Sequence, residues 1–397
     1  MFQKGLKYLS NNKAEKALAC FKKCTETKEV LTNMGTCYRL LGNDEKAQDL
    51  YIRALNKNVP FLDNSFADSY PVALNNLSLI AYTYEDDELA AKLLLNALEQ
   101  DPLYYDAIWN LANTRLRQYF SGKYSDLKTC WELYDYRFKR ANPVGLKNTK
   151  KDLIMWDGRP VDKIVVLAEQ GFGDQMMFGR YLHKLPADKV YVQCHPRARA
   201  LFGDIYECVN DPADCDAEYG VPFCSLGKFF YEDIPSLEWL SDKYISKLKD
   251  GKMDVGVTWS GSHTHVNNKY RSTTPNYFRG LADICNLYTL NPTEAGTAGF
   301  TALKSGGWHE SLEELSKLDL VITVDTSIAH LCGSVGMPCW VLMGLKNNDF
   351  RWGDSSCGFD NKWYKSVRVF RNNGSWDDVF TEVRNELIKY KHSLGCV

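Results

Sequence analysis

The first third of this 397-residue chain repeats itself. An asparagine followed by an apolar residue recurs at Asn33, Asn76 and Asn110, at steps of 43 and 34 residues. An alanine lies 14 residues after each of the first two, at Ala47 and Ala90. Steps of this size are typical of stacked helical repeats, because each unit buries its apolar face only against its neighbours. The repetition therefore predicts an array of helix–turn–helix units.

The spacing of small and large side chains supports paired helices. An earlier copy places Ala17 and Phe21 where the next copy has Ala47 and Tyr51, at a shift of 30 residues. Small residues let two helices approach closely, and large ones fill the gap between neighbouring turns. Pro60 and Pro102 are expected to end second helices, and the longer step falls in the polar segment 61–70. A plain helical bundle is the alternative architecture.

These positions resemble the tetratricopeptide repeat. Ten residues carry the resemblance: Gly35, Tyr38, Gly42, Ala47, Tyr51, Ala54, Ala90, Leu94, Ala97 and Pro102. Arrays of this family usually bind a peptide or a protein partner in a concave groove. Here the groove is expected either to bind a protein or to brace the rest of the chain.

The remaining two-thirds alternate apolar runs with helical patterns. Short β-forming runs occur at 163–168, 190–194, 253–259, 320–324 and 339–343, with a weak one at 288–290. Helical patterns occur at 175–185, 311–318, 328–335 and 376–390. Alternation of this kind predicts two doubly wound, Rossmann-like α/β lobes, whose ligands bind at the carboxyl ends of the strands.

These patterns divide the chain into four segments. We expect the helical repeats over 1–140, a linker over 141–160, a first Rossmann-like lobe over 161–250 and a second over 251–397. The junction is locally basic, with Arg137, Lys139, Arg140, Lys147, Lys150 and Lys151. A solvated face explains such a run of charge, and contact with a polyanion is the alternative.

Composition and the amino terminus narrow the class of protein. The formal net charge is −2, which gives no overall field for nucleic acid. The 13 cysteines form no CxxC pair, so we expect free thiols, no metal site and a reducing cytoplasm. Residues 1–13 lack the apolar core of a signal peptide, and no run of about 18 apolar residues predicts a membrane span.

The first candidate site is the loop Glu169-Gln170-Gly171-Phe172-Gly173-Asp174, which follows a predicted strand. Its glycines permit a tight turn and close approach of a ligand. Asp174 stands at the start of a helix, where an aspartate often serves as a cap. The functional interpretation is a carboxylate base that takes a proton from a hydroxyl nucleophile.

Two further clusters also follow predicted strands. Ser260 and Gly261, with Lys269 and Arg271 beyond them, offer amide, hydroxyl and cationic groups to a departing diphosphate, although a surface loop has the same composition. The third cluster is Asp325, Thr326, Ser327 and His330. A helix amino terminus suits a pyrophosphate, and the alternative is a capped helix with a core histidine.

Taken in order, these motifs resemble the heptosyltransferase-like glycosyltransferases of family 9, in the bacterial and phage form fused to tetratricopeptide repeats. Five segments of the back part carry the resemblance: 155–158, 168–181, 257–272, 323–331 and 349–364. The junction helix at 131–137 also fits. The resemblance implies a GT-B fold, in which the second lobe binds a nucleotide-sugar donor without a metal or other cofactor.

Residue by residue, the resemblance gives Asp174 the role of catalytic base. It places Ser260, Gly261, Arg271, Asp325, Thr326, Ser327 and His330 at the donor, where the charge pattern also leads us to expect Lys269, and Glu169, Gln170, Gly171, Gly173 and Arg180 in the acceptor loop. Gln175–Met177 departs from the family's pattern, so the acceptor side is expected to differ. Residues 344–348 also depart from it, in the loop that would recognise the nucleobase of the donor.

The expected activity is metal-independent, inverting transfer of a sugar from a nucleotide-sugar donor to an acceptor hydroxyl. Protein and saccharide acceptors rank first, and modified bases of phage DNA are the alternative acceptor, because the basic junction could follow phosphates. A different class of function is a non-catalytic scaffold, in which the repeats bind a partner and the α/β part is a relic.

Overall fold

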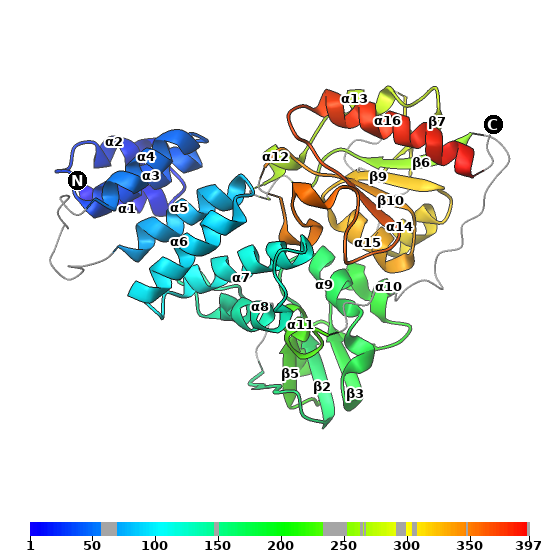
Figure 1. Cartoon of the computed structure of the whole chain (residues 1–397). Coiled ribbons are helices and arrows are strands. Elements are labelled where there is room, and N and C mark those ends of the chain that lie inside the picture. The colour runs from blue at the N-terminus through cyan, green and yellow to red at the C-terminus, as the bar shows by residue number, and fades with distance from the viewer. Residues whose placement is uncertain are drawn as a thin grey trace. The chain divides into compact units, whose positions relative to one another are not determined.

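The computed structural model describes residues 1–56, 70–146, 151–232, 252–262, 265, 267–290, 299–303, 308–346 and 348–394. These residues form two compact units (Figure 1). Unit 1 comprises Met1–Gln118 with Glu132–Pro143, and unit 2 comprises Tyr119–Trp131 with the chain from Val144 onward. Among the described residues, no helix is both long enough and apolar enough to cross a bilayer.

The described part of unit 1 consists of helices, and each packs mainly on its neighbours in sequence. The helices are α1 (Phe2–Ser10), α2 (Ala14–Phe21), α3 (Lys28–Leu40), α4 (Asp44–Ala54), α5 (Pro71–Thr83) and α6 (Asp87–Gln100), then α7 (Tyr105–Phe120) and α8 (Leu127–Tyr134), which extend into unit 2. A 3₁₀ helix, Asp135–Phe138, follows α8.

The predicted pairing of small and large residues is found in this unit. Gly5 of α1 lies against the ring of Phe21, and Gly35 of α3 lies in the same way against Tyr51. Phe21 and Tyr51 are fully buried, so each ring occupies space that a side chain on the facing glycine would need. Pro102 follows the end of α6 as expected, while Pro60 and most of segment 61–70 lie outside the described residues.

Unit 2 contains two sheets whose strands all run parallel (Figure 1). The first has the order β1-β5-β2-β3-β4, and its strands are β1 (Ile154–Met155), β2 (Val161–Leu167), β3 (Ala187–Gln193), β4 (Glu207–Val209) and β5 (Tyr219–Pro222). The helices of this lobe are α9 (Phe172–Gly179), α10 (Arg199–Phe202) and α11 (Leu226–Phe229), with 3₁₀ turns at Leu182–Lys184, Pro196–Ala198, Pro212–Asp214 and Phe223–Ser225.

The second sheet has the order β11-β10-β9-β6-β7-β8. Its strands are β6 (Met253–Thr258), β7 (Cys285–Thr289), β8 (Thr301–Ala302), β9 (Leu320–Val324), β10 (Cys339–Leu342) and β11 (Val367–Phe370). The accompanying helices are α12 (Asn268–Arg271), α13 (Pro275–Arg279), α14 (Trp308–Leu315), α15 (Ser327–Val335) and α16 (Trp376–Ser393), with 3₁₀ turns at Phe350–Trp352 and Ser355–Cys357.

The strand order reverses at β2 in the first sheet and at β6 in the second. In the first sheet, β3 and β4 lie on one side of β2 and β5 lies on the other. In the second sheet, β7 and β8 lie on one side of β6 and β9 lies on the other. A crevice opens at the carboxyl ends of the strands at such a reversal. The three loops singled out in the sequence follow β2, β6 and β9, which are the strands at these two points.

Candidate functional site

Asp174 lies on the third residue of α9, a helix that begins directly after the glycine loop of β2. The Gly171 N–H donates to Asp174 Oδ2 over 2.9 Å, so the carboxylate covers one of the free amides at the helix start. Gln170, the residue before Gly171, has a φ of 52°, a left-handed conformation that is uncommon for a residue with a side chain. The capping interpretation of Asp174 therefore describes one of its two carboxylate oxygens.

The other oxygen of Asp174 is paired with a residue from the second lobe. Arg351 donates to Asp174 Oδ1, and the same guanidinium donates to Asp349 Oδ2 over 2.6 Å. The Arg351 Nε–H contacts Met177 Sδ at 3.2 Å. The Asp174 side chain is 15% exposed and that of Arg351 is 10% exposed, so this ion pair is largely shielded from water.

The third cluster begins immediately after β9. Thr326 caps α15, since its hydroxyl accepts from the Ile328 N–H over 3.3 Å. Asp325 Oδ1 accepts from the Trp352 indole N–H over 2.9 Å, and the Asp325 carbonyl accepts from Arg271 Nη1 over 2.7 Å. Part of Asp325 stays exposed, yet burial of its carboxyl group and the neighbouring Asp349 raise its pKa.

Arg271 connects the second cluster to the third. A side chain on Gly261 would overlap the Arg271 guanidinium, and the Gly261 N–H donates to Asn268 Oδ1 over 3.1 Å. Arg271 Nε is buried and has no hydrogen-bond partner among the described residues. Ser260 is half-buried at the end of β6, whereas Lys269 is exposed with its ammonium over the Tyr270 ring.

His330 lies inside the protein, as the core-histidine interpretation describes. Its Nδ1 is 3.1 Å from the Tyr364 hydroxyl, and its ring stacks on Trp352 with 5.3 Å between centroids. A Cβ on Gly173 would lie 2.7 Å from His330 Cδ2, so only glycine fits opposite the ring without a shift. The ring thus joins the Asp174 loop to α15, and its enclosure leaves little surface for contact with a ligand.

Burial, together with the guanidinium groups of Arg351 and Arg180, holds the pKa of His330 well below its ordinary value of 6.5. Below pH 6.5, His330 is therefore protonated in the unfolded chain but stays neutral in the folded protein. The free energy of unfolding is highest above pH 6.5 and falls as the pH drops. We expect a contribution of up to about 1.4 kcal/mol per pH unit. Urea unfolding of the wild type and His330→Gln between pH 7 and 5 measures it, with exposed His183→Gln as control. Equal slopes for all three proteins would contradict this assignment.

Two of the residues expected in the acceptor loop, Glu169 and Arg180, are buried and do not face an acceptor surface. Glu169 is fully buried and accepts from the Cys224 N–H over 2.9 Å. Arg180 is also buried, and its Nη1 donates to the Trp363 carbonyl over 2.9 Å. Gly171 is exposed at the start of α9. Both buried charges fix the loop and α9 from within.

The basic junction offers little free positive charge in its described part. Arg137 is fully buried and donates to Asp135, and Arg140 is paired with Asp106 at 2.8 Å. Lys151 donates to the Cys215 carbonyl over 2.8 Å. Lys139 is exposed, while Lys147 and Lys150 lie outside the described residues. These contacts favour the solvated or structural interpretation of the run over a phosphate-binding one.

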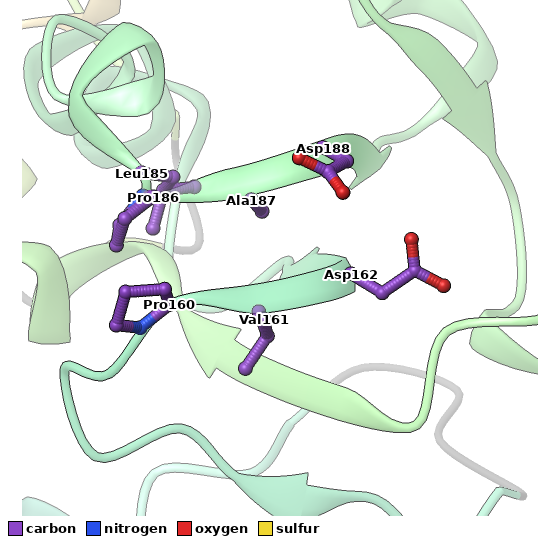
Figure 2. Close-up of a pocket in the computed structure, with 7 residues that line it drawn as sticks. All are labelled: Pro160, Val161, Asp162, Leu185, Pro186, Ala187 and Asp188. Atoms are coloured by element: carbon purple, nitrogen blue, oxygen red, sulfur yellow. The ribbon is translucent and has the colours of Figure 1, made fainter.

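A separate surface hollow lies at the amino ends of the strands of the first sheet, opposite the carboxyl ends that carry the candidate site. Figure 2 shows its lining at the amino ends of β2 and β3, with Asp162 on β2 and Asp188 on β3. Its volume is about 590 Å³. Because ligands of doubly wound sheets bind at the carboxyl ends of the strands, this hollow lies at the edge away from the candidate site.

Sequence reasoning did not select Arg351, Asp349, Trp352 or Tyr364 as site residues. All four follow β10, in a segment without regular strands, and reach the site only through contacts that span many residues in sequence. One signal was present: the run Asp349–Gly353 was among the segments that carry the family resemblance.

Comparisons with known proteins found no matching family model and no match among curated proteins. Among solved structures, the chain is similar to the iron-containing dodecameric glycosyltransferase TibC of enterotoxigenic E. coli, at 12% identity and a TM-score of 0.39, over 60% of this chain and 78% of that one. It is also similar to a mutant O-GlcNAc transferase of Thermobaculum terrenum, at 12% identity and a TM-score of 0.35, over 99% and 92%. Similarity to MamA covers 33% of this chain and 71% of that chain, at 18% identity and a TM-score of 0.26. Likeness at this level assigns no activity to the chain.

Proposed function

We propose that the chain is a glycosyltransferase that moves a sugar from a nucleotide-sugar donor to an acceptor hydroxyl, with inversion and without a metal. The observation that carries the proposal is the ion pair between Asp174, in the first turn of α9, and Arg351, from the second lobe. The residue after Arg351, Trp352, donates to Asp325, which lies just before α15. The carboxylate of Asp174, the guanidinium groups of Arg351 and Arg271, and the amino terminus of α15 all belong to segments that follow strands of the two parallel sheets.

In the proposed reaction Asp174 takes the proton of the acceptor hydroxyl as its oxygen attacks the anomeric carbon. The bond from that carbon to the diphosphate breaks, and the diphosphate leaves with the electron pair. In this structure Asp174 Oδ2 accepts from the Gly171 N–H and Asp174 Oδ1 accepts from Arg351. Attack from the face opposite the leaving group inverts the anomeric centre.

The leaving diphosphate needs positive charge and amide donors. Arg271 is suited to this role because its Nε–H is buried without a partner among the described residues, beside the Asp325 carbonyl. The amides at the start of α15 add the positive end of a helix dipole. In this scheme His330 packs against Tyr364 and Trp352, and it holds these two side chains and the Gly173 backbone in position.

Calorimetric titration with UDP, GDP, ADP and CMP tests the donor site. We expect at least one nucleotide to bind, and Arg271→Met to weaken that binding by about 10- to 100-fold, since a charge-assisted hydrogen bond is worth roughly 1.5–3 kcal/mol. Arg384→Met, which removes an arginine from an exposed ion pair with Asp283, serves as the matched control. The proposed donor site is wrong if no nucleotide binds or if both variants behave alike.

A further inference from the structure

The carboxylate proposed as the base is already held by a cation. Arg351 bridges Asp174 and Asp349, and the Arg351 and Asp174 side chains are only 10% and 15% exposed. A general base must present its oxygen to the substrate proton, and a guanidinium on the same oxygen competes for that position. The structure therefore shows Asp174 in a paired state.

Arg351 also lies beside the groups proposed to hold the diphosphate. Its positive charge acts to lower the pKa of both Asp325 and His330. The next residue, Trp352, donates to Asp325 Oδ1 and stacks on His330. An anion seated at the start of α15 would thus lie near the guanidinium that now holds Asp174.

Several contacts fix the backbone that carries Arg351. The Asp354 N–H donates to Ser121 Oγ over 2.8 Å, and Lys123 pairs with the Asp354 carboxylate at 2.6 Å. The rings of Phe120 and Phe350 stack with 6.2 Å between centroids. These contacts hold the 349–354 segment in place, so exchange requires only a rotation about the side-chain bonds of Arg351.

We propose that Arg351 is an exchangeable partner that couples donor binding to activation of the base. In this structure Arg351 pairs with Asp174. When a nucleoside diphosphate group binds, its oxygens take the guanidinium, because a phosphate accepts bidentate bonds from arginine. Asp174 is then released to accept the hydroxyl proton. This inference rests on the proposed function and assigns Arg351 a donor-binding role in it.

The coupling predicts an unusual result for the base itself. Asp174→Asn removes the competitor for Arg351, so the variant is expected to bind nucleoside diphosphate about three- to tenfold more tightly than the wild type. Arg351→Met is expected to bind it about tenfold more weakly. In the double variant, Asp174→Asn should add nothing, because no guanidinium remains to be released.

Titration of the four proteins with UDP, GDP and ADP completes this cycle. Asp157→Asn, which removes one carboxylate from an exposed ion pair with Arg159, should leave the affinity unchanged. If Asp174→Asn tightens binding equally with and without Arg351, the effect is general charge repulsion and the exchange is overturned. Unchanged or weaker binding by Asp174→Asn also overturns it while leaving the donor site standing. Failure of the wild type to bind any nucleotide removes the proposed function and this inference together.

Discussion

Replacement of Asp174 by asparagine should lower kcat for sugar transfer by about 10²- to 10⁴-fold, the usual contribution of a positioned general base. Asparagine keeps an oxygen that can accept from the Gly171 N–H, so the start of α9 should remain capped. It cannot take up the proton of the acceptor hydroxyl at neutral pH. Initial rates at saturating donor and acceptor, together with far-UV circular dichroism of the folded variant, measure the effect.

Asp349→Asn is the matched control for this prediction. Asp349 pairs with the same guanidinium, at 2.6 Å, but lies in the loop before the 3₁₀ helix Phe350–Trp352. If Asp174 acts as the base, Asp349→Asn should retain kcat within about tenfold while Asp174→Asn does not. Similar losses in both variants would mean that the ion pair with Arg351 is needed only to build the loop.

The second large effect is expected in the helical unit, at a buried ion pair. Arg117 of α7 and Asp87 of α6 have side chains that are 0% and 4% exposed. Arg117 Nε donates to both oxygens of Asp87, over 3.0 and 2.9 Å, and Nη2 donates to the Tyr82 carbonyl over 2.6 Å. The guanidinium also lies 3.6 Å from the centre of the Tyr82 ring. The pair is therefore extensively hydrogen-bonded inside the unit.

Asp87→Asn should lower the free energy of unfolding of this unit by about 3–5 kcal/mol, because it leaves a buried guanidinium without its counter-charge. Denaturant unfolding followed by circular dichroism at 222 nm measures the change. Glu26→Gln breaks an exposed pair with Arg53 and should cost less than about 1 kcal/mol. A loss for Asp87→Asn as small as that of the control would show that the buried pair contributes little.

Regular elements were predicted well where the apolar pattern was continuous. The run 320–324 is β9, and 376–390 lies within α16. The helix expected over 175–185 starts earlier and ends at Gly179, since the chain turns there and continues as the 3₁₀ helix Leu182–Lys184. The run expected at 288–290 is the end of the longer strand β7.

Several strands were not predicted because their sequences carry weak signals. β4, Glu207–Val209, has three residues, and β5, Tyr219–Pro222, contains a glycine and a proline that usually mark turns. β1 lies in the segment expected to be a linker and pairs with β5 in parallel. β11 contains an arginine, Arg368, whose guanidinium lies over Phe359. These strands form through pairing with neighbours that are distant in sequence.

Only the site residues that come shortly after a predicted strand could be predicted from the sequence. Asp174 and Asp325 stand at strand ends, where the topology of a parallel sheet places functional groups. Arg351 has no such marker, and only the fold brings its guanidinium to Asp174. The sequence left a core histidine as the alternative interpretation of His330, because its enclosure by Trp352, Tyr364 and Gly173 depends on three separate segments.

The most direct measurement is a mass-spectrometric screen for turnover of sugar nucleotides by the wild type and by Asp174→Asn. Slow hydrolysis counts as turnover, because water can replace an unidentified acceptor. The proposal predicts that the wild type cleaves at least one donor to its nucleoside diphosphate and free sugar, and that Asp174→Asn binds the same donor but does not cleave it. No cleavage of any UDP-, GDP-, ADP- or CMP-sugar by the wild type, or equal cleavage by both proteins, would contradict it.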